Sequence, residues 1–221
     1  MTAFYHLGKA AVVPLAKGIW RPTITGREHI PRTGGVILAS NHLSFIDSFA
    51  IPIASPRPVS FLAKSDYFTG TGVMGAIRRG FFVGSQAIPV DRHSSRAAQE
   101  SLELALEVLK EGRAFGIYPE GTRSRDGRLY RGRTGVAWLA LTAGVPVVPV
   151  GLVGTDKVQP VGSRLPSLAK VRVAFGRPIS PERYAGMPAG RARRELTDEV
   201  MTAIAALYGQ ERLDAYNELP P

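Results

Sequence analysis

The stretch from Val36 to Asp47 reads VILASNHLSFID, and it decides the fold class of the chain. It opens with an uninterrupted apolar run, the pattern of a buried strand, and becomes polar immediately afterwards. Similar apolar runs follow and alternate with helical stretches. In order, the strand candidates cover residues 36–39, 59–62, 87–90, 114–118, 147–153 and 171–175. This alternation predicts an α/β fold, a single domain with a mainly parallel central sheet flanked by helices.

Helical patterns fill three of the intervals in this arrangement. The clearest begins at Ser94 or Ser95 and ends at Lys110, because apolar residues recur there on one face and Gly112 follows as a stop signal. The others cover about 134–143 and 191–208. A chain of 221 residues, 44% of them hydrophobic, is long enough for one domain with a substantial core.

Composition narrows the classes of function. Lys and Arg number 28 against 18 Asp and Glu, and the formal charge of +10 indicates an anionic partner such as a nucleic acid, an acidic bilayer or a phosphorylated substrate. The absence of cysteine excludes disulfides, thiolate metal sites and a cysteine nucleophile. His6, His29 and His93 lack the spacing of metal ligands, so we expect no metal site.

Residues 1–20 form a segment of their own, followed by a main domain over residues 21–221. The segment is rich in aromatic and aliphatic side chains, but two lysines and a proline interrupt it, so it is too short and too broken to span a bilayer. It fits either an interfacial helix on a membrane, with Trp20 near the headgroups, or an ordinary helix packed on the domain. The glycine-rich, apolar region 67–84 is a candidate for a substrate-facing lid or a membrane-dipping loop.

The densest chemical signal is the polar end of the opening stretch, Asn41 to Asp47. It lies at the carboxyl end of a predicted strand, where open α/β sheets place their sites. Across a strand-to-helix turn, Asp47 can hold one imidazole nitrogen of His42 while the other faces a substrate hydroxyl, which makes the pair a candidate base with a fixed tautomer. The pattern Ser44-x-x-Asp47 is also that of a helix-capping box, in which Asp47 would bind only backbone amides.

A second strand end, Tyr118 to Ser124, offers a carboxylate, a glycine turn and an arginine. We expect the two strand ends to face one cleft, because parallel strands bring their carboxyl ends to the same edge of a sheet. The basic run that continues to Arg133 exceeds what one phosphate requires and predicts a surface that faces anionic lipid or the phosphates of a donor.

These blocks resemble the PlsC-type glycerolipid acyltransferases, a family that includes the 1-acylglycerol-3-phosphate acyltransferases. The family carries N-H-x-x-x-x-D, I-x-x-D-R, F-P-E-G-T-R-S and V-P-[IV]-x-P-V blocks in this order. The corresponding blocks of this sequence are Asn41–Asp47, Ile88–Arg92, Tyr118–Ser124 and Val145–Val150. Tyr118 stands where the family has phenylalanine, and Pro89 stands where it has a bulkier residue.

The resemblance implies a glycerol-3-phosphate acyltransferase-like fold, with residues 21–221 as an acyltransferase domain. It implies an O-acyltransferase that moves a fatty acyl group to the free hydroxyl of 1-acyl-sn-glycerol 3-phosphate, giving phosphatidic acid in phospholipid biosynthesis. His42 would be the general base and Asp47 its orienting partner. The substrate-binding residues that it implies are Lys64, Arg92, Glu120, Gly121, Thr122 and Arg123.

The implied partners are a lysophospholipid acceptor and an acyl thioester donor, either acyl-CoA or acyl carrier protein. No cofactor, metal or nucleic acid is implied. The expected location is the cytoplasmic face of the cell membrane, where the chain would be a peripheral or monotopic protein on anionic lipid.

Two alternatives remain at this point. One keeps the reaction but changes the acceptor to another lysophospholipid, a glycolipid or glycerol 3-phosphate. The other is a basic RNA- or membrane-binding module without catalysis, which the net charge and the arginine run would also fit.

Overall fold

Strands and helices alternate through most of the described chain. The computed structural model describes residues 18, 20–64, 72, 88–90, 95–160, 163 and 166–218. The strands are β1 (Thr23–Thr25), β2 (Val36–Ser40), β3 (Val59–Ser60), β4 (Leu62–Lys64), β5 (Ile88–Val90), β6 (Ala114–Ile117), β7 (Val147–Val153) and β8 (Arg172–Phe175). The helices are α2 (Asp47–Ala54), α4 (Ser95–Lys110), α5 (Gly135–Ala143), α6 (Thr155–Val158) and α7 (Ala189–Tyr208), with 3-10 turns at Arg27–His29 and Pro181–Tyr184.

A six-stranded sheet in the order β1-β8-β7-β2-β6-β3 forms the centre of the fold. The four strands β7, β2, β6 and β3 run parallel to one another. β8 is antiparallel to β7 and parallel to β1, and β4 and β5 form a separate parallel pair. Because β2 lies between β6 and β7, the carboxyl ends of these three strands meet at one edge of the sheet.

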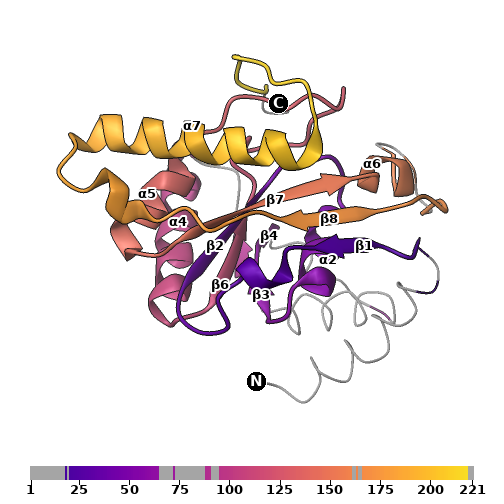
Figure 1. Cartoon of the computed structure of the whole chain (residues 1–221), viewed down its shortest axis with the longest axis horizontal. Coiled ribbons are helices and arrows are strands. Elements are labelled where there is room, and N and C mark those ends of the chain that lie inside the picture. Colours follow the sequence, from indigo (N-terminus) through magenta and orange to yellow (C-terminus); the bar gives the residue numbers. More distant parts are fainter. Residues whose placement is uncertain are drawn as a thin grey trace.

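Helices cover both faces of this sheet. β2 is buried along its whole length, and its side chains alternate between two apolar clusters. Ile37 packs into the cluster formed with α4, α5 and α7, while Leu38 packs into the opposite cluster with Ile51 of α2. Figure 1 shows the three helices gathered on one side of the sheet and α2 on the other. Burying an Ile or Leu side chain contributes about 1.5–3 kcal/mol, so Ile37 and Leu38 of β2 help to hold the helices on both faces of the sheet.

The predicted α/β class and mainly parallel sheet are confirmed. Each predicted strand appears, but the segment 59–62 divides at Phe61 into β3 and β4, which belong to different sheets. The predicted 171–175 strand, β8, runs antiparallel to its neighbour β7. Val153 at the end of β7 pairs with Arg172 at the start of β8. The sequence pattern missed the three-residue strand β1, which is too short to show a period.

The predicted helices are present within two residues of their expected ends, as α4, α5 and α7. Residues 1–17 and 19 of the predicted interfacial segment lie outside the described residues, and so does the region 67–84 apart from Gly72. Within the described ranges, no helix combines the length and the apolar character needed to cross a bilayer.

Candidate active site

The ends of β2 and β6 bring the two predicted blocks together. The peptide unit of His42, directly after β2, is held by the loop that follows β6: its N–H donates to Oε1 of Glu120 at 3.0 Å. Its carbonyl oxygen accepts the backbone N–H of Ser124 at 2.8 Å. The blocks 41–47 and 118–124 therefore form one site, as expected for neighbouring parallel strands.

Asp47 organises the histidine side of this site. Its Oδ2 lies 2.8 Å from Nδ1 of His42 and accepts the backbone N–H groups of Leu43 at 2.7 Å and Ser44 at 2.8 Å. Asp47 is fully buried, whereas the His42 side chain is 16% exposed. The same oxygen therefore binds backbone amides, as the capping interpretation expects, and also contacts the imidazole, as the orienting interpretation expects. Nδ1 donates to this carboxylate, which leaves Nε2 as the nitrogen able to take a proton.

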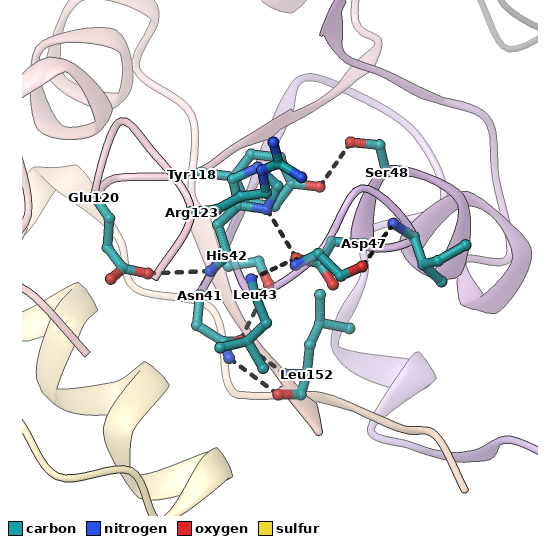
Figure 2. Close-up of polar contacts among 12 residues, drawn as sticks. Asn41, His42, Leu43, Asp47, Ser48, Tyr118, Glu120, Arg123 and Leu152 are labelled. Carbon is teal, nitrogen blue, oxygen red and sulfur yellow. Dashed lines mark hydrogen bonds and ion pairs between the residues drawn. The ribbon is translucent and has the colours of Figure 1, made fainter. Parts of the chain in front are cut away.

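The face of the imidazole is covered by Tyr118. The two rings stack with centroids 3.8 Å apart and planes 9° apart. The phenol oxygen lies 3.0 Å from Oγ of Ser48 in the first turn of α2. Burial raises the pKa of Tyr118 well above its ordinary value, and the nearby charge of Asp47 adds to this, so the phenol stays protonated. Figure 2 shows Asp47 and Glu120 reaching His42 from opposite sides, with Tyr118 over its ring.

Glu120 has an environment that the sequence did not indicate. Its side chain is 1% exposed. One carboxyl oxygen accepts the N–H of His42 and the other accepts the N–H of Tyr130, each at 3.0 Å. Burial raises its pKa to about 7, although both backbone hydrogen bonds act in the opposite direction. Glu120 therefore joins the end of β2 to the loop that carries Tyr130.

A strap formed by residues 210–217 holds this loop from outside. The Leu129 N–H donates to the Glu211 carbonyl, and the Leu213 N–H donates to the Leu129 carbonyl, both at 2.9 Å. The Arg131 N–H donates to the Ala215 carbonyl at 2.9 Å. Tyr130 lies between these anchored positions, so the strap supports the donor that meets Glu120.

Asn41 is a further structural anchor of the site. Its side chain is fully buried and mimics a strand partner for Leu152 of β7: Oδ1 accepts the Leu152 N–H at 2.8 Å, and Nδ2 donates to the Leu152 carbonyl at 3.0 Å. Nδ2 also lies 3.3 Å from Oε1 of Gln210, at the start of the strap. The asparagine preceding a candidate base was visible in the sequence, but Leu152 and Gln210, which it bonds, are more than a hundred residues away.

The basic run from Arg123 to Arg133 separates into two groups. Arg128 forms an ion pair with Asp126 at 2.7 Å, and Arg131 forms one with Asp214 at 3.6 Å. The Arg133 guanidinium lies over the Tyr216 ring, and its Nη2 donates to the Asn217 carbonyl of the strap at 3.4 Å. Arg123 and Arg125 are exposed, and neither forms an ion pair with any described residue. Only part of the run is thus available to an external anion.

The other predicted substrate-binding residues are placed as follows. Gly121 adopts φ 82° in the turn closed by its N–H on the Tyr118 carbonyl, a conformation that favours glycine. Thr122 is half-buried between this turn and Arg123. Lys64 is the last residue of β4, and Arg92 lies outside the described residues.

Within the described part of the chain, no group of three or more His, Asp or Glu side chains is arranged to hold a metal ion.

An apolar cavity of about 180 Å³ lies on the other side of α2. Residues at its lining include Trp20, Ile24, Ile46, Phe49, Val158 and Val171. Ile46 directly precedes Asp47, so the cavity shares a helix turn with the His42 partner. Its apolar lining suits a hydrocarbon chain.

The chain is similar to known acyltransferases. A family model described as Acyltransferase matches residues 21–153. The chloroplastic 1-acyl-sn-glycerol-3-phosphate acyltransferase BAT2 of Brassica napus is 32% identical over 162 residues, which are 72% of this chain and 45% of that protein. The 1-acyl-sn-glycerol-3-phosphate acyltransferase of Bacillus subtilis is 25% identical over 193 residues, 86% of this chain and 89% of that protein.

A solved structure shares the fold. The crystal structure of the 1-acyl-sn-glycerophosphate acyltransferase PlsC from Thermotoga maritima has a TM-score of 0.67 and 23% sequence identity, and the match covers 94% of this chain and 84% of that chain. The chain spans about half the length of the chloroplast relatives, 45% of the Brassica protein and 44% of LPAT1 from Arabidopsis thaliana. The matched residues 21–153 contain both strand ends of the site and more than half of the sequence, so the chain belongs to the Acyltransferase family.

Proposed function

We propose that this chain is an O-acyltransferase that moves a fatty acyl group from acyl-CoA, or from acyl carrier protein, to the free hydroxyl of 1-acyl-sn-glycerol 3-phosphate. The product would be phosphatidic acid. The observation that carries the proposal is the 2.8 Å contact between His42 Nδ1 and Asp47, made at a sheet edge that also presents the exposed Arg123. The names of the relatives agree with this reaction.

The reaction follows from the chemistry of the imidazole. With Nδ1 engaged by Asp47, Nε2 of His42 takes the proton of the acceptor hydroxyl as its oxygen attacks the thioester carbonyl. The tetrahedral intermediate collapses with cleavage of the C–S bond, and the imidazolium returns the proton to the departing thiolate. No covalent enzyme intermediate is needed, and the cysteine-free chain has no thiol that could form one.

A phosphorylated acceptor is proposed because Arg123, an exposed positive charge, lies at the same sheet edge as His42. A guanidinium group pairs with two phosphate oxygens at once, which suits Arg123 for a phosphorylated glycerol. Lys64 and Arg92 are proposed to assist it on the basis of the family motif, and Gly121 and Thr122 would shape the turn from which Arg123 projects. The buried Glu120 is proposed to hold His42 in place, because both of its oxygens are occupied by backbone amides.

Membrane attachment is proposed through residues 1–20, on the anionic cytoplasmic face of the cell membrane. The aromatic and aliphatic composition of this segment and the net charge of +10 support it. Trp20 also lines the apolar cavity beside α2, and its indole N–H donates to the Ser167 carbonyl at 3.0 Å.

Thiol release tests the proposed reaction. Acyl-CoA and lysophosphatidic acid are mixed with the protein, and we expect equal amounts of free thiol and phosphatidic acid. His42→Ala should lower turnover at least about 100-fold, the usual contribution of a general base, while circular dichroism remains unchanged. The control is His29→Ala, since His29 bonds the Phe175 carbonyl instead of Asp47. Turnover with glycerol 3-phosphate or another acceptor alone would redirect the assignment, and silence with every acceptor would favour a binding module.

Arg123 tests the acceptor site. A charge-assisted hydrogen bond contributes about 1.5–3 kcal/mol, so Arg123→Ala should raise KM for lysophosphatidic acid roughly 10- to 100-fold. The KM for acyl-CoA should stay within about 2-fold, and Arg123→Lys should be intermediate because it keeps charge without the planar fork. Arg128→Ala is the matched control, since Arg128 is already paired with Asp126. Unchanged acceptor kinetics in Arg123→Ala would remove this residue from the site.

The raised pKa of Glu120 predicts that the free energy of unfolding depends on pH in a specific way. Its pKa of about 7 in the folded state exceeds the ordinary value of 4.5, so folding takes up a proton between these two values. The stability contribution is present below pH 4.5 and is lost as the pH rises through 7, by on the order of 3 kcal/mol. Urea unfolding between pH 4.5 and 8 should show this decline for the wild type and not for Glu120→Gln. Glu107→Gln, an exposed glutamate on α4, should decline like the wild type.

Vesicle flotation tests the membrane segment. Deleting residues 1–17 retains Trp20 and should reduce flotation with vesicles that contain anionic lipid at least several-fold. Added salt should weaken binding of the full chain, because surface electrostatics are screened within about 8–10 Å. Equal flotation of the two proteins would reject this segment as the anchor.

A further inference from the structure

The single hydrogen bond that His42 donates to Asp47 does not by itself fix the orientation of the imidazole ring. A contact at Nδ1 sets the position of one ring atom, but small coupled changes of χ1 and χ2 can still tilt the imidazole while Nδ1 stays within hydrogen-bonding distance of Oδ2. Such a tilt moves Nε2, the atom that must face the acceptor hydroxyl. Productive proton transfer requires hydrogen-bond distance at that atom, so a second constraint on the ring is needed.

The flat contact with Tyr118 supplies this second constraint. Rings 3.8 Å apart and within 9° of parallel leave no room for the imidazole to tilt toward the phenol. The aromatic ring therefore defines the plane of His42, while Asp47 defines its rotation within that plane. Together they determine the direction in which Nε2 points.

Tyr118 is itself held at two places, its hydroxyl and its ring. Its hydroxyl lies 3.0 Å from Ser48 Oγ, and Ser48 follows Asp47 directly in α2. Its ring lies 5.6 Å from that of Phe61, with the planes 26° apart. Phe61 fits there because Gly116 has no side chain: a Cβ at position 116 would lie 2.1 Å from a Phe61 ring atom. The two constraints on His42 are thus tied to the same helix.

We propose that Tyr118 is a positioning residue for the base, and that the Tyr118–Ser48 hydrogen bond locks its ring to the helix that carries Asp47. This proposal rests on the function proposed above, in which His42 is the general base. The family pattern has phenylalanine at this position, so the hydroxyl is a departure of this chain from that pattern. The stack provides the orientation, and the hydroxyl limits the movement of the stack.

Kinetics of four variants separate these contributions. Tyr118→Leu should lower kcat roughly 10- to 100-fold and leave KM for both substrates within about 2-fold, because orientation and not binding is lost. Tyr118→Phe restores the ring and should recover most of the loss, remaining about 3-fold below the wild type. Ser48→Ala should match Tyr118→Phe, and the double variant should be no slower than either single one, because both remove the same hydrogen bond.

Tyr184→Phe is the control for loss of a tyrosine hydroxyl, since that group bonds Glu199 of α7 and not a residue of the site. Wild-type kcat in Tyr118→Leu, a loss confined to KM, or a Tyr118→Phe variant as slow as Tyr118→Leu would overturn the proposal. Additive effects of Tyr118→Phe and Ser48→Ala would overturn the locking role. This last test remains available if Tyr118→Leu fails to fold.

A measurement without turnover separates this proposal from the proposed reaction. The chain has four histidines, so His42 can be assigned in an imidazole NMR spectrum by comparison with His42→Ala. The ring current of Tyr118 should shift the His42 carbon-bound protons upfield in the wild type and in Tyr118→Phe, but not in Tyr118→Leu. An unchanged spectrum in Tyr118→Leu would refute the stack even in an active enzyme. The expected shift in an inactive protein would refute only the reaction.

Discussion

The site depends on one buried oxygen, Oδ2 of Asp47, which receives an imidazole nitrogen and two backbone N–H groups within 2.7–2.8 Å. A buried carboxylate requires such donors, because an unsatisfied charged group in the interior costs several kcal/mol. The same contacts on Oδ2 also shape the turn between β2 and α2, whereas Oδ1 of Asp47 is buried and has no hydrogen-bond partner among the described residues. The turn and the imidazole therefore depend on the same carboxylate, so a substitution of Asp47 would disturb both the turn and the orientation of His42.

The parallel sheet supplies the rest of the site by bringing strand ends together. Each loop at this edge is tied to a neighbour by a buried polar group: Glu120 links the ends of β2 and β6, and Asn41 links the ends of β2 and β7. The strap 210–217 lies outside the residues matched by the family model, yet it supports Tyr130 and reaches Asn41 through Gln210. Rigidity at the base thus comes from several segments that are distant in the sequence.

Sequence reasoning succeeded where the relevant interaction is short in range. The apolar runs predicted the strands, and the five-residue separation of His42 and Asp47 corresponds to a direct contact. It missed β1, which has three residues and gains its structure from pairing with β8. It also treated the basic run as one surface, whereas the ion pairs of Arg128 and Arg131 with acidic side chains leave Arg123 and Arg125 exposed.

By itself, the sequence determined the α/β class and the resemblance to a family, and it indicated His42 and Asp47 as a candidate pair, because periodicity and a short motif are encoded within a few consecutive residues. Only the tertiary structure decided that Glu120 binds two backbone amides, that Tyr118 covers the imidazole face and that Asn41 bonds Leu152. The reason is physical. A side chain acquires its partners, burial and pKa from groups that neighbouring strands bring close, and the order of strands in the sheet is not written in any local stretch.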